Sequence, residues 1–173
     1  MSDLQTEQGA TRTRTVTWED PTSVGPQTIA LSGLDIMQRI RDGALPPPPM
    51  ARLIGFECVV AETGEIVMEI SPDGSVENGL GIAHGGMVAT MLDTAMGAAA
   101  NTVLPAGKVS VTLDLTITYL AAVKRGSAPI RATGKVTNVG RRTIYVVGEV
   151  RARADKLVAH AVGNFSIIDI PAG

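Results

Sequence analysis

The stretch NGLGIAHGGMVATMLDTAMGAAAN, residues 78–101, decides the fold of this chain. It opens as a glycine-rich loop around His84 and then becomes a run of mostly apolar residues. Apolar side chains recur in that run every three or four positions, which is the helical period: Val88, Met91, Leu92, Ala95 and Ala99. Further apolar residues widen the stripe, so the pattern predicts a helix that is buried on most sides in the middle of a domain.

Asp93 does not fit the apolar character of that helix. Its carboxylate competes for backbone donors in a helix interior, and the ionised form is costly to bury without partners. Small residues surround it at helical spacing: Ala89, Thr90, Gly97 and Ala100. We interpret this face as one that another group approaches closely. The alternative is a buried aspartate whose carboxylate is satisfied by a neighbouring backbone group or by Thr90.

The composition excludes several classes of protein. A chain of 173 residues with 45% hydrophobic content predicts one compact domain with a substantial core. A net charge of −2 and an aromatic content of 3% argue against nucleic-acid binding. Cys58 is the only cysteine, which excludes an internal disulfide and fits a reducing compartment. The apolar segments are too short for a signal peptide or a membrane span, so we expect a cytoplasmic protein without a membrane partner.

Residues 1–49 are predicted to form an N-terminal extension. Ser32 and Asp35 resemble a capping box, and the apolar positions that follow predict a short amphipathic helix. Residues 46–49 are all proline, which indicates a stiff, extended spacer. The spacer marks a boundary, after which a single domain is expected over residues 50–170.

Alternation with a period of two predicts strands on both sides of the helix. The expected strands cover residues 54–62, 64–71, 109–119, 130–139, 144–154 and 157–168. Because the connections are short, consecutive strands are expected to be antiparallel neighbours. Residues 12–18 also alternate, which suits either an edge strand or a disordered terminus. The sequence therefore predicts an α+β domain in which one face of an antiparallel sheet packs on a single helix.

Several familiar catalytic patterns are missing from the sequence. The glycines of residues 79–86 do not complete a dinucleotide-binding fingerprint, and no βαβ unit surrounds them. Two histidines and one cysteine make no recognisable metal cluster, and there is no G-x-S-x-G nucleophile elbow. We therefore expect neither a metal nor a resident cofactor.

Four residues remain that carry chemistry: Asn78, His84, Gly85 and Asp93. Gly85 stands at the predicted helix start, where free N–H groups and the helix dipole favour negative charge. Asp93 offers a base or a nucleophile, while Asn78 and His84 offer neutral hydrogen-bonding groups. These are the parts needed to transfer an acyl group to water: an oxyanion hole, a carboxylate and orienting polar groups.

The pattern of Asn78, the His-Gly-Gly motif at 84–86 and Asp93 resembles the signature of the hot-dog-fold thioesterases, in particular the phenylacetate-pathway (PaaI-type) branch. The segment KVSVTLDLTITYL, residues 108–120, is similar to the first long strand after the helix in that family. The resemblance covers residues 50–168 and implies a hot-dog fold, a sheet wrapped around one long helix. It also implies hydrolysis of an acyl-CoA thioester, in which coenzyme A is part of the substrate and no separate cofactor is used.

The resemblance implies a role for each candidate residue. The Gly85 N–H and Asn78 would polarise the thioester carbonyl, and His84 would help to hold the loop and the thioester. Asp93 would activate water or attack the carbonyl directly. Ser110 matches a serine that positions the water in several members. A polar strand position that faces solvent explains Ser110 equally well.

Four basic residues in predicted turns could meet the phosphates of coenzyme A: Lys124, Arg125, Arg141 and Arg142. The alternative is that these charges are only solvated. The sequence does not specify the acyl group. Two other functions stay open: an acyl-thioester dehydratase or hydratase, which needs a histidine–acid pair, and a non-catalytic acyl-CoA binder, which would tolerate loss of Asp93.

Each active site is predicted to contain residues from two chains. His84 and Asp93 are nine residues apart, which separates their backbones by about 13 Å along a helix and puts them on nearly opposite sides of it. Two helices packed antiparallel about a two-fold axis would bring the Gly85 end of one near Asp93 of the other. The family resemblance implies the same homodimer with shared sites, commonly paired further into a tetramer.

Overall fold

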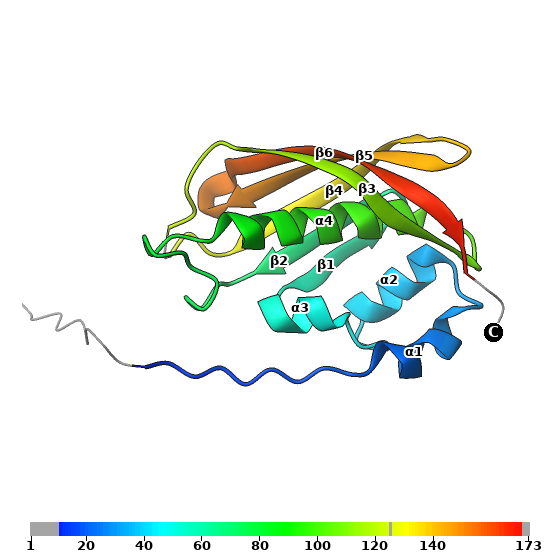
Figure 1. Ribbon diagram of the computed structural model, residues 1–173, viewed down its shortest axis with the longest axis horizontal. Helices are drawn as coiled ribbons and strands as arrows, with labels where there is room; N and C mark the ends of the chain where they lie inside the picture. The colour runs from blue at the N-terminus through cyan, green and yellow to red at the C-terminus, as the bar shows by residue number, and fades with distance from the viewer. Residues whose placement is uncertain (1–10, 125, 171–173) are drawn as a thin grey trace, which may run out of the picture.

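The computed structural model describes residues 11–124 and 126–170. Six antiparallel strands form one sheet that curves around a long helix, α4 (Gly85–Thr102) (Figure 1). The strand order is β1-β2-β4-β5-β6-β3, with bounds Glu57–Glu62, Glu65–Ile70, Ile130–Val139, Thr143–Ala152, Lys156–Asp169 and Lys108–Tyr119, respectively. The predicted α+β architecture, an antiparallel sheet packed on one central helix, is confirmed.

The core lies between α4 and the concave face of the sheet. Successive turns of α4 carry side chains with no solvent exposure, among them Met91, Leu92, Ala95 and Met96. They meet fully buried side chains from five strands, among them Ile66, Ile130, Ile144, Val146 and Phe165. Burying each large apolar side chain contributes about 1.5–3 kcal/mol, so this contact is the main source of stability.

Two glycines on adjacent strands let the sheet approach α4 closely, Gly134 and Gly148, whereas Gly163 makes room mainly for the β3 backbone at Asp114. A Cβ added at Gly134 would lie 2.4 Å from the carbonyl oxygen of Ala95 and 2.7 Å from Cα of Met96. A Cβ at Gly148 would lie 2.6 Å from Sδ of Met96. Gly134 and Gly148 are direct partners in the β4–β5 pair. The backbone of α4 therefore rests against the sheet itself at this point.

β3 changes its inward face halfway along its length. Its register with β6 shifts between Thr112 and Asp114, which marks a bulge. Before the bulge, Ser110 is buried and Thr112 hydrogen-bonds to α4. After the bulge, Leu115 and Ile117 pack against the core instead. One strand thus presents polar side chains to the later half of α4 and apolar ones to its beginning.

The connection between β3 and β4 differs from the prediction. β3 pairs with β6 at one edge of the sheet, whereas β4 lies between β2 and β5. Residues 120–129 therefore cross from the sheet edge to its middle. The expectation that these two consecutive strands are neighbours is wrong, because a ten-residue connection is long enough to pass over the end of the sheet.

Before β1, the described residues form three helices: α1 (Pro21–Thr28) and α2 (Gly33–Arg41) in the N-terminal extension, and α3 (Pro49–Ile54) at its junction with the domain. α2 confirms the predicted helix and its capping box, since Ser32 Oγ accepts from the Asp35 N–H and the Asp35 carboxylate accepts from the Ser32 N–H. α1 and α3 were not predicted; both begin at prolines, residues well suited to a first helical turn. The strand expected over residues 54–62 is wrong at its start, because Ile54 ends α3 and β1 begins at Glu57. Residues 12–18 form no strand within the described chain. α2 packs on β1 and α4.

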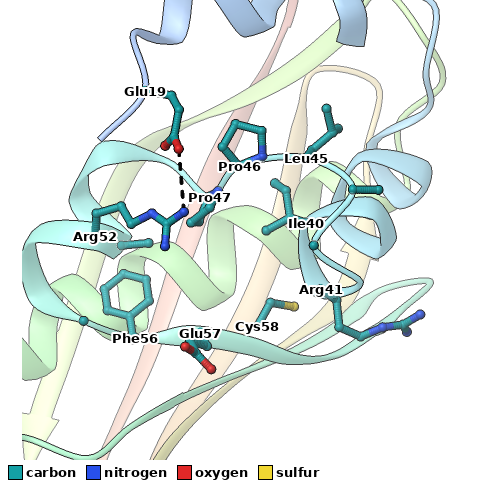
Figure 2. A pocket seen from close by; sticks show the side chains of 14 residues that line it. Glu19, Ile40, Arg41, Leu45, Pro46, Pro47, Arg52, Phe56, Glu57 and Cys58 are labelled. Atoms are coloured by element: carbon teal, nitrogen blue, oxygen red, sulfur yellow. Dashed lines mark ion pairs between the residues drawn. The ribbon is translucent and has the colours of Figure 1, made fainter. Parts of the chain in front are cut away.

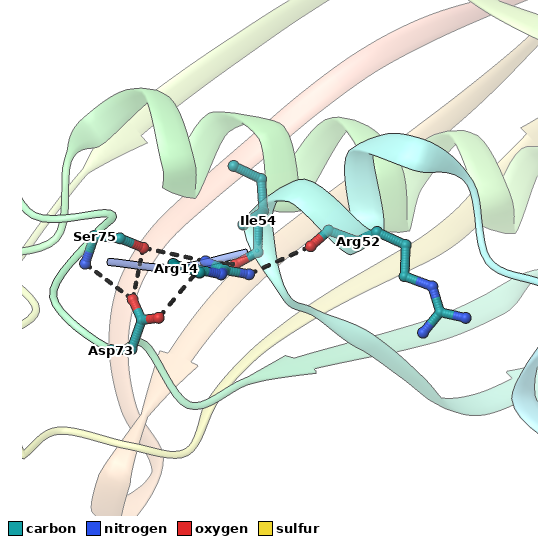
Figure 3. Close-up of polar contacts among 5 residues, drawn as sticks. All are labelled: Arg14, Arg52, Ile54, Asp73 and Ser75. Atoms are coloured by element: carbon teal, nitrogen blue, oxygen red, sulfur yellow. Dashed lines mark hydrogen bonds and ion pairs between the residues drawn. The ribbon is translucent and has the colours of Figure 1, made fainter. Parts of the chain in front are cut away.

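Arg14 ties the first described segment to the body of the protein (Figure 3). Its guanidinium donates to the carbonyl oxygens of Arg52 (3.3 Å) and Ile54 (3.4 Å), at the end of α3. It also donates to Ser75 Oγ (3.1 Å) and forms an ion pair with Asp73 (3.7 Å). A cation at a helix C-terminus satisfies carbonyls that have no partner within the helix. The extension is thereby held against the loop after β2.

We expect Gly134→Ala to lower the free energy of unfolding by about 3 kcal/mol, the upper end for an overpacked core. The added methyl group would meet the backbone of α4, which cannot move aside as a side chain can. Urea unfolding followed by circular dichroism measures the change. The control is Gly25→Ala in α1, where an added Cβ meets no atom within 4 Å. Equal stability of Gly134→Ala and the wild type would show that α4 is not seated as closely as described.

Candidate active site

The loop before α4 is held by hydrogen bonds from Asn78. Its Oδ1 accepts from the N–H of Leu80 (2.9 Å) and of Ile82 (3.5 Å). The Asn78 N–H in turn donates to the Ile82 carbonyl oxygen (2.8 Å). This use of Oδ1 fixes the orientation of the amide, and no described residue accepts from Nδ2. Asn78 therefore presents an N–H donor whose position is set by the loop.

His84 is the N-cap of α4. Its Nδ1 accepts from the Gly86 N–H (2.9 Å), so the neutral imidazole carries its proton on Nε2. The backbone N–H of His84 donates to the Val76 carbonyl oxygen (2.8 Å), which fixes the loop from the other side. Gly85 follows as the first helical residue, and its N–H has no carbonyl one turn earlier to bind. The helix dipole adds positive potential at this donor.

Tyr119 holds the start of α4 in place, and the sequence analysis assigned it no role. Its hydroxyl donates to the Gly85 carbonyl oxygen (2.9 Å), and its ring lies 3.6 Å from the position of a Gly85 Cβ. The sequence carries a signal for this role, because Tyr119 follows Leu115 and Ile117 at alternate positions on the inward face of β3 and adds a hydroxyl at the strand end. Asn78, Gly85 and Tyr119 line a common cavity of about 350 Å³.

Asp93 is exposed to solvent in the single chain. The Thr112 hydroxyl donates to its Oδ1 (2.8 Å), and Thr90 instead donates to the carbonyl oxygen of Gly86. The alternative of a buried Asp93 satisfied by a backbone group or by Thr90 is therefore wrong for the single chain. β3 is an edge strand that leaves this side of α4 uncovered, so one chain does not remove the carboxylate from water.

Ser110 is buried, so the alternative of a solvent-facing strand position is wrong. Its Oγ lies 3.1 Å from Asn101 Oδ1 and 3.3 Å from the Gly97 carbonyl oxygen, and its N–H donates to the same Oδ1 (2.7 Å). Asn101 is a second residue that the sequence analysis did not single out. It sits two turns after Asp93 on α4 and fixes Ser110 against the helix.

Asp93 and Ser110 line a second cavity, of about 380 Å³. It runs beside α4 between β3 and the N-terminal extension, and it shares no lining residue with the cavity of Asn78 and Gly85. The structure thus brings the predicted site residues together in two groups. One chain pairs Asn78 with Gly85, and Asp93 with Ser110, but it does not join the two groups. His84 lies with the first group at the helix start.

The predicted basic residues are also divided. Lys124 is exposed and bridges to Ile82, beside the loop of the first group. Arg141 and Arg142 are exposed in the β4–β5 turn, where the Arg142 carbonyl accepts from the Ile167 N–H. Arg125 lies outside the described residues. Within one chain these cations sit at opposite ends of the sheet and form no common patch.

A third cavity, of about 670 Å³, lies between the N-terminal extension and β1 (Figure 2). Cys58 lines both this cavity and that of Asp93. Burial raises the pKa of its thiol to about 11, so the side chain is a neutral, weakly polar group near neutral pH. Among the described residues, no three histidine, cysteine, aspartate or glutamate side chains gather as metal ligands. None of the described helices is long and apolar enough to cross a membrane.

Comparison with known proteins gives one consistent family. The family model of the thioesterase superfamily matches residues 80–159, which include α4 and most of the sheet. One relative is a protein of Saccharolobus solfataricus that is named as an esterase. It is 31% identical over 117 residues, which cover 68% of this chain and 81% of the relative.

Two solved structures agree with this family in both sequence and fold. The first is a form of the phenylacetic acid degradation protein PaaI from Thermus thermophilus, with 28% identity and a TM-score of 0.63; the match covers 69% of this chain and 98% of that one. The second is a protein of Streptococcus mutans bound to acetyl-CoA, with 27% identity and a TM-score of 0.61, covering 66% of this chain and 89% of that one. The chain therefore belongs to the thioesterase superfamily, as a thioester hydrolase with the PaaI-like hot-dog fold.

Proposed function

We propose that this protein hydrolyses acyl-CoA thioesters to a free acid and coenzyme A, at a site built from two chains. The observation that carries the proposal is the division of the site residues along one rigid helix. Gly85 and Asp93 lie on α4 with about 12 Å of helix axis between them, and each lines its own cavity. A thioester carbonyl reaches both groups only if a second copy supplies one of them.

One half of the site, formed by Asn78, His84 and Gly85 of one chain (the Gly85 half), would bind the carbonyl oxygen of the thioester. The Gly85 N–H lies at the positive end of α4, and the Asn78 amide is oriented by its own loop. Both are donors fixed before substrate arrives, which is the condition for stabilising an oxyanion as it forms. His84 holds the loop through the Gly86 N–H, and its Nε2–H faces outward as a further donor to the thioester.

The other half of the site, formed by Asp93 and Ser110 of the second chain (the Asp93 half), would supply the base or nucleophile. Thr112 occupies Oδ1, which leaves Oδ2 for water or for the carbonyl carbon. If Asp93 acts as the base, it takes a proton from water as the water oxygen bonds to the carbonyl carbon. The carbon–sulfur bond then breaks, and the coenzyme A thiolate leaves and takes up that proton. Ser110, fixed by Asn101, would position the water in the same cavity.

The same pairing would unite the basic residues. Lys124 lies beside the Gly85 half. Arg142, in the turn before β5, and Ser110, on β3, both neighbour Ile167 of β6. An antiparallel dimer would therefore place Lys124 of one chain and Arg141 and Arg142 of the other around one site. Arg125 neighbours Lys124 in sequence and would join that set. These cations would meet the phosphates of coenzyme A. The Streptococcus mutans protein, which is similar to this chain, is bound to acetyl-CoA.

The exposed edge of β3 offers a surface for the second copy. β3 pairs only with β6, and Val111 and Leu113 on its outer face are 43% and 57% exposed. An edge strand with exposed apolar residues is normally paired or covered. A two-fold axis beside this edge would align two β3 strands and bring the uncovered side of α4, which carries Asp93, against its equivalent. We also propose that two such dimers pair into a tetramer, which a measurement of the native mass would detect.

A dehydratase or hydratase is disfavoured by the state of His84. Its Nδ1 accepts from the Gly86 N–H, which leaves Nε2 protonated, as a hydrogen-bond donor rather than as a base that could take a proton from carbon. Moving a proton on carbon needs a histidine poised as acid or base, which this arrangement does not provide. The non-catalytic binder is separated from the thioesterase by the role of Asp93.

We expect Asp93→Asn to fold normally and to lose at least about 100-fold in turnover, since the substitution removes the only carboxylate of the site while keeping its shape. Release of free thiol from acyl-CoA substrates measures the activity. The control is Asp20→Asn, because asparagine caps a helix as well as aspartate does and Asp20 lies at the start of α1. Turnover of Asp93→Asn within a few-fold of the wild type would remove Asp93 from the mechanism.

Two inactive variants should restore activity when they share a dimer. His84→Ala and Asp93→Ala each damage a different half of the site. In a mixed dimer, the intact His84 of one chain meets the intact Asp93 of the other, so one of the two sites is complete. The two proteins are unfolded together, refolded and isolated as heterodimers by two different affinity tags. About half of the wild-type activity per dimer is expected, because one of two sites is intact. Heterodimers that stay inactive while both parents are folded would contradict the shared site.

A further inference from the structure

The Asp93 cavity and the third cavity are separated by one layer of side chains. Five residues line both of them: Ile40, Pro47, Ala51, Phe56 and Cys58. Four of these five lie in residues 33–56, the segment that includes α2 and α3, and Cys58 lies in β1. Figure 2 shows Ile40 and Cys58 projecting from α2 and β1 into the space between these elements. The N-terminal segment is thus a wall of the Asp93 cavity.

One wall of the Asp93 cavity is polar, and the opposite wall is apolar. The polar wall lies where β3 meets α4: Thr112 hydrogen-bonds to Asp93, and Ser110 to Asn101 two turns further along the helix. The opposite wall consists of apolar side chains, mostly from the extension: Met37, Ile40, Pro47, Pro48, Ala51, Phe56 and Met68. Along α4 the polar wall extends from Asp93 through Gly97 to Asn101, which is about 12 Å. A Cβ added at Gly97 would lie 3.3 Å from the Phe165 ring, which also lines this cavity.

We propose that residues 37–58 form the end of an acyl-chain chamber, and that Ile40 and Cys58 set the greatest chain length that it accepts. The inference rests on the proposed hydrolysis of acyl-CoA at Asp93. The substrate class is an unbranched, apolar acyl group of medium length, roughly eight to ten carbons. A volume of about 380 Å³ holds roughly a dozen carbon-sized groups, taking ~30 Å³ for each. The length of about 12 Å along the α4 wall suits an extended chain better than a compact ring.

The charges beyond Ile40 and Cys58 explain why the chain should end there. The third cavity is lined by Glu19, Arg41 and Arg52, of which Arg52 faces Glu19 at 3.8 Å. An apolar chain end pushed among these groups would displace water from charges without replacing its hydrogen bonds. Cys58 belongs with the apolar wall, because its raised pKa keeps the thiol uncharged.

The test uses affinities for S-alkyl-CoA thioethers, which cannot be hydrolysed, with alkyl chains of about 2 to 16 carbons. Isothermal titration calorimetry gives the dissociation constants, and thiol release from the matching acyl-CoA series gives activity in parallel. Ile40→Ala removes part of the wall, so affinity for a chain of about 14 carbons, relative to about 8, should rise at least tenfold. Cys58→Leu adds bulk at the same wall, so affinity for about 8 carbons, relative to about 4, should fall at least tenfold.

Leu53→Ala is the matched control, since Leu53 is an aliphatic residue of α3 that is 53% exposed and lines neither cavity. Its chain-length profile should match that of the wild type. Unmoved profiles in both folded wall variants, or a preference for phenylacetyl over every linear chain, would overturn the proposal. Absence of thiol release with intact, length-dependent thioether binding would refute the hydrolysis and leave the chamber supported. The two failures are therefore distinguishable.

Discussion

The structure depends on the direct contact between the backbone of α4 and β4 at Gly134, beside which Gly148 makes room for the Met96 side chain. At Gly134 an added Cβ would lie 2.4 Å from a helix carbonyl oxygen, so no other residue allows the same separation. The contact buries the apolar faces of helix and sheet at native density, and it leaves α4 without room to shift or bend. The active-site geometry follows from this rigidity. Groups on α4 keep fixed separations, and a site that needs both Gly85 and Asp93 must obtain them from two copies of the helix.

The bulge in β3 complements that rigid helix. An extra residue near Thr112 reverses the alternation of the strand. The inward face therefore carries Ser110 and Thr112 beside the second half of α4, and Leu115 to Tyr119 beside its first turn. Without the bulge, one of the two halves would lose its partner from β3: either the hydroxyl on Asp93 or the hydroxyl on the Gly85 carbonyl. A single edge strand supports both halves of the site.

Local patterns explain what could be predicted from the sequence. The period of α4, the capping box at Ser32 and the alternation of the strands each depend on neighbouring residues, and each agrees with the structure. The prediction that the site is divided between two chains follows from helix geometry alone, through the nine-residue spacing of His84 and Asp93. It stays a prediction.

The features that were missed depend on contacts between distant segments. Gly134 and Gly148 look like interruptions in strands, and their role appears only when α4 lies on them. Exposure of Asp93 depends on β3 being the last strand of the sheet, which strand periodicity does not reveal. Tyr119 and Asn101 gain their roles from partners 34 and 9 residues away, respectively. Sequence patterns identify elements, whereas these properties arise from how elements meet.

The N-terminal extension links stability to selectivity in this protein. Met37 of α2 belongs to the main hydrophobic core and also lines the Asp93 cavity, and Phe56 does the same at the start of β1. Substituting either residue would change the packing and the cavity together, so a loss of activity there would not identify its cause. Ile40 is only partly buried and packs against the core from its edge. Its contribution to the cavity wall can therefore be separated from its contribution to folding, which makes the rim of the extension the place where chain-length selectivity can vary independently of the fold.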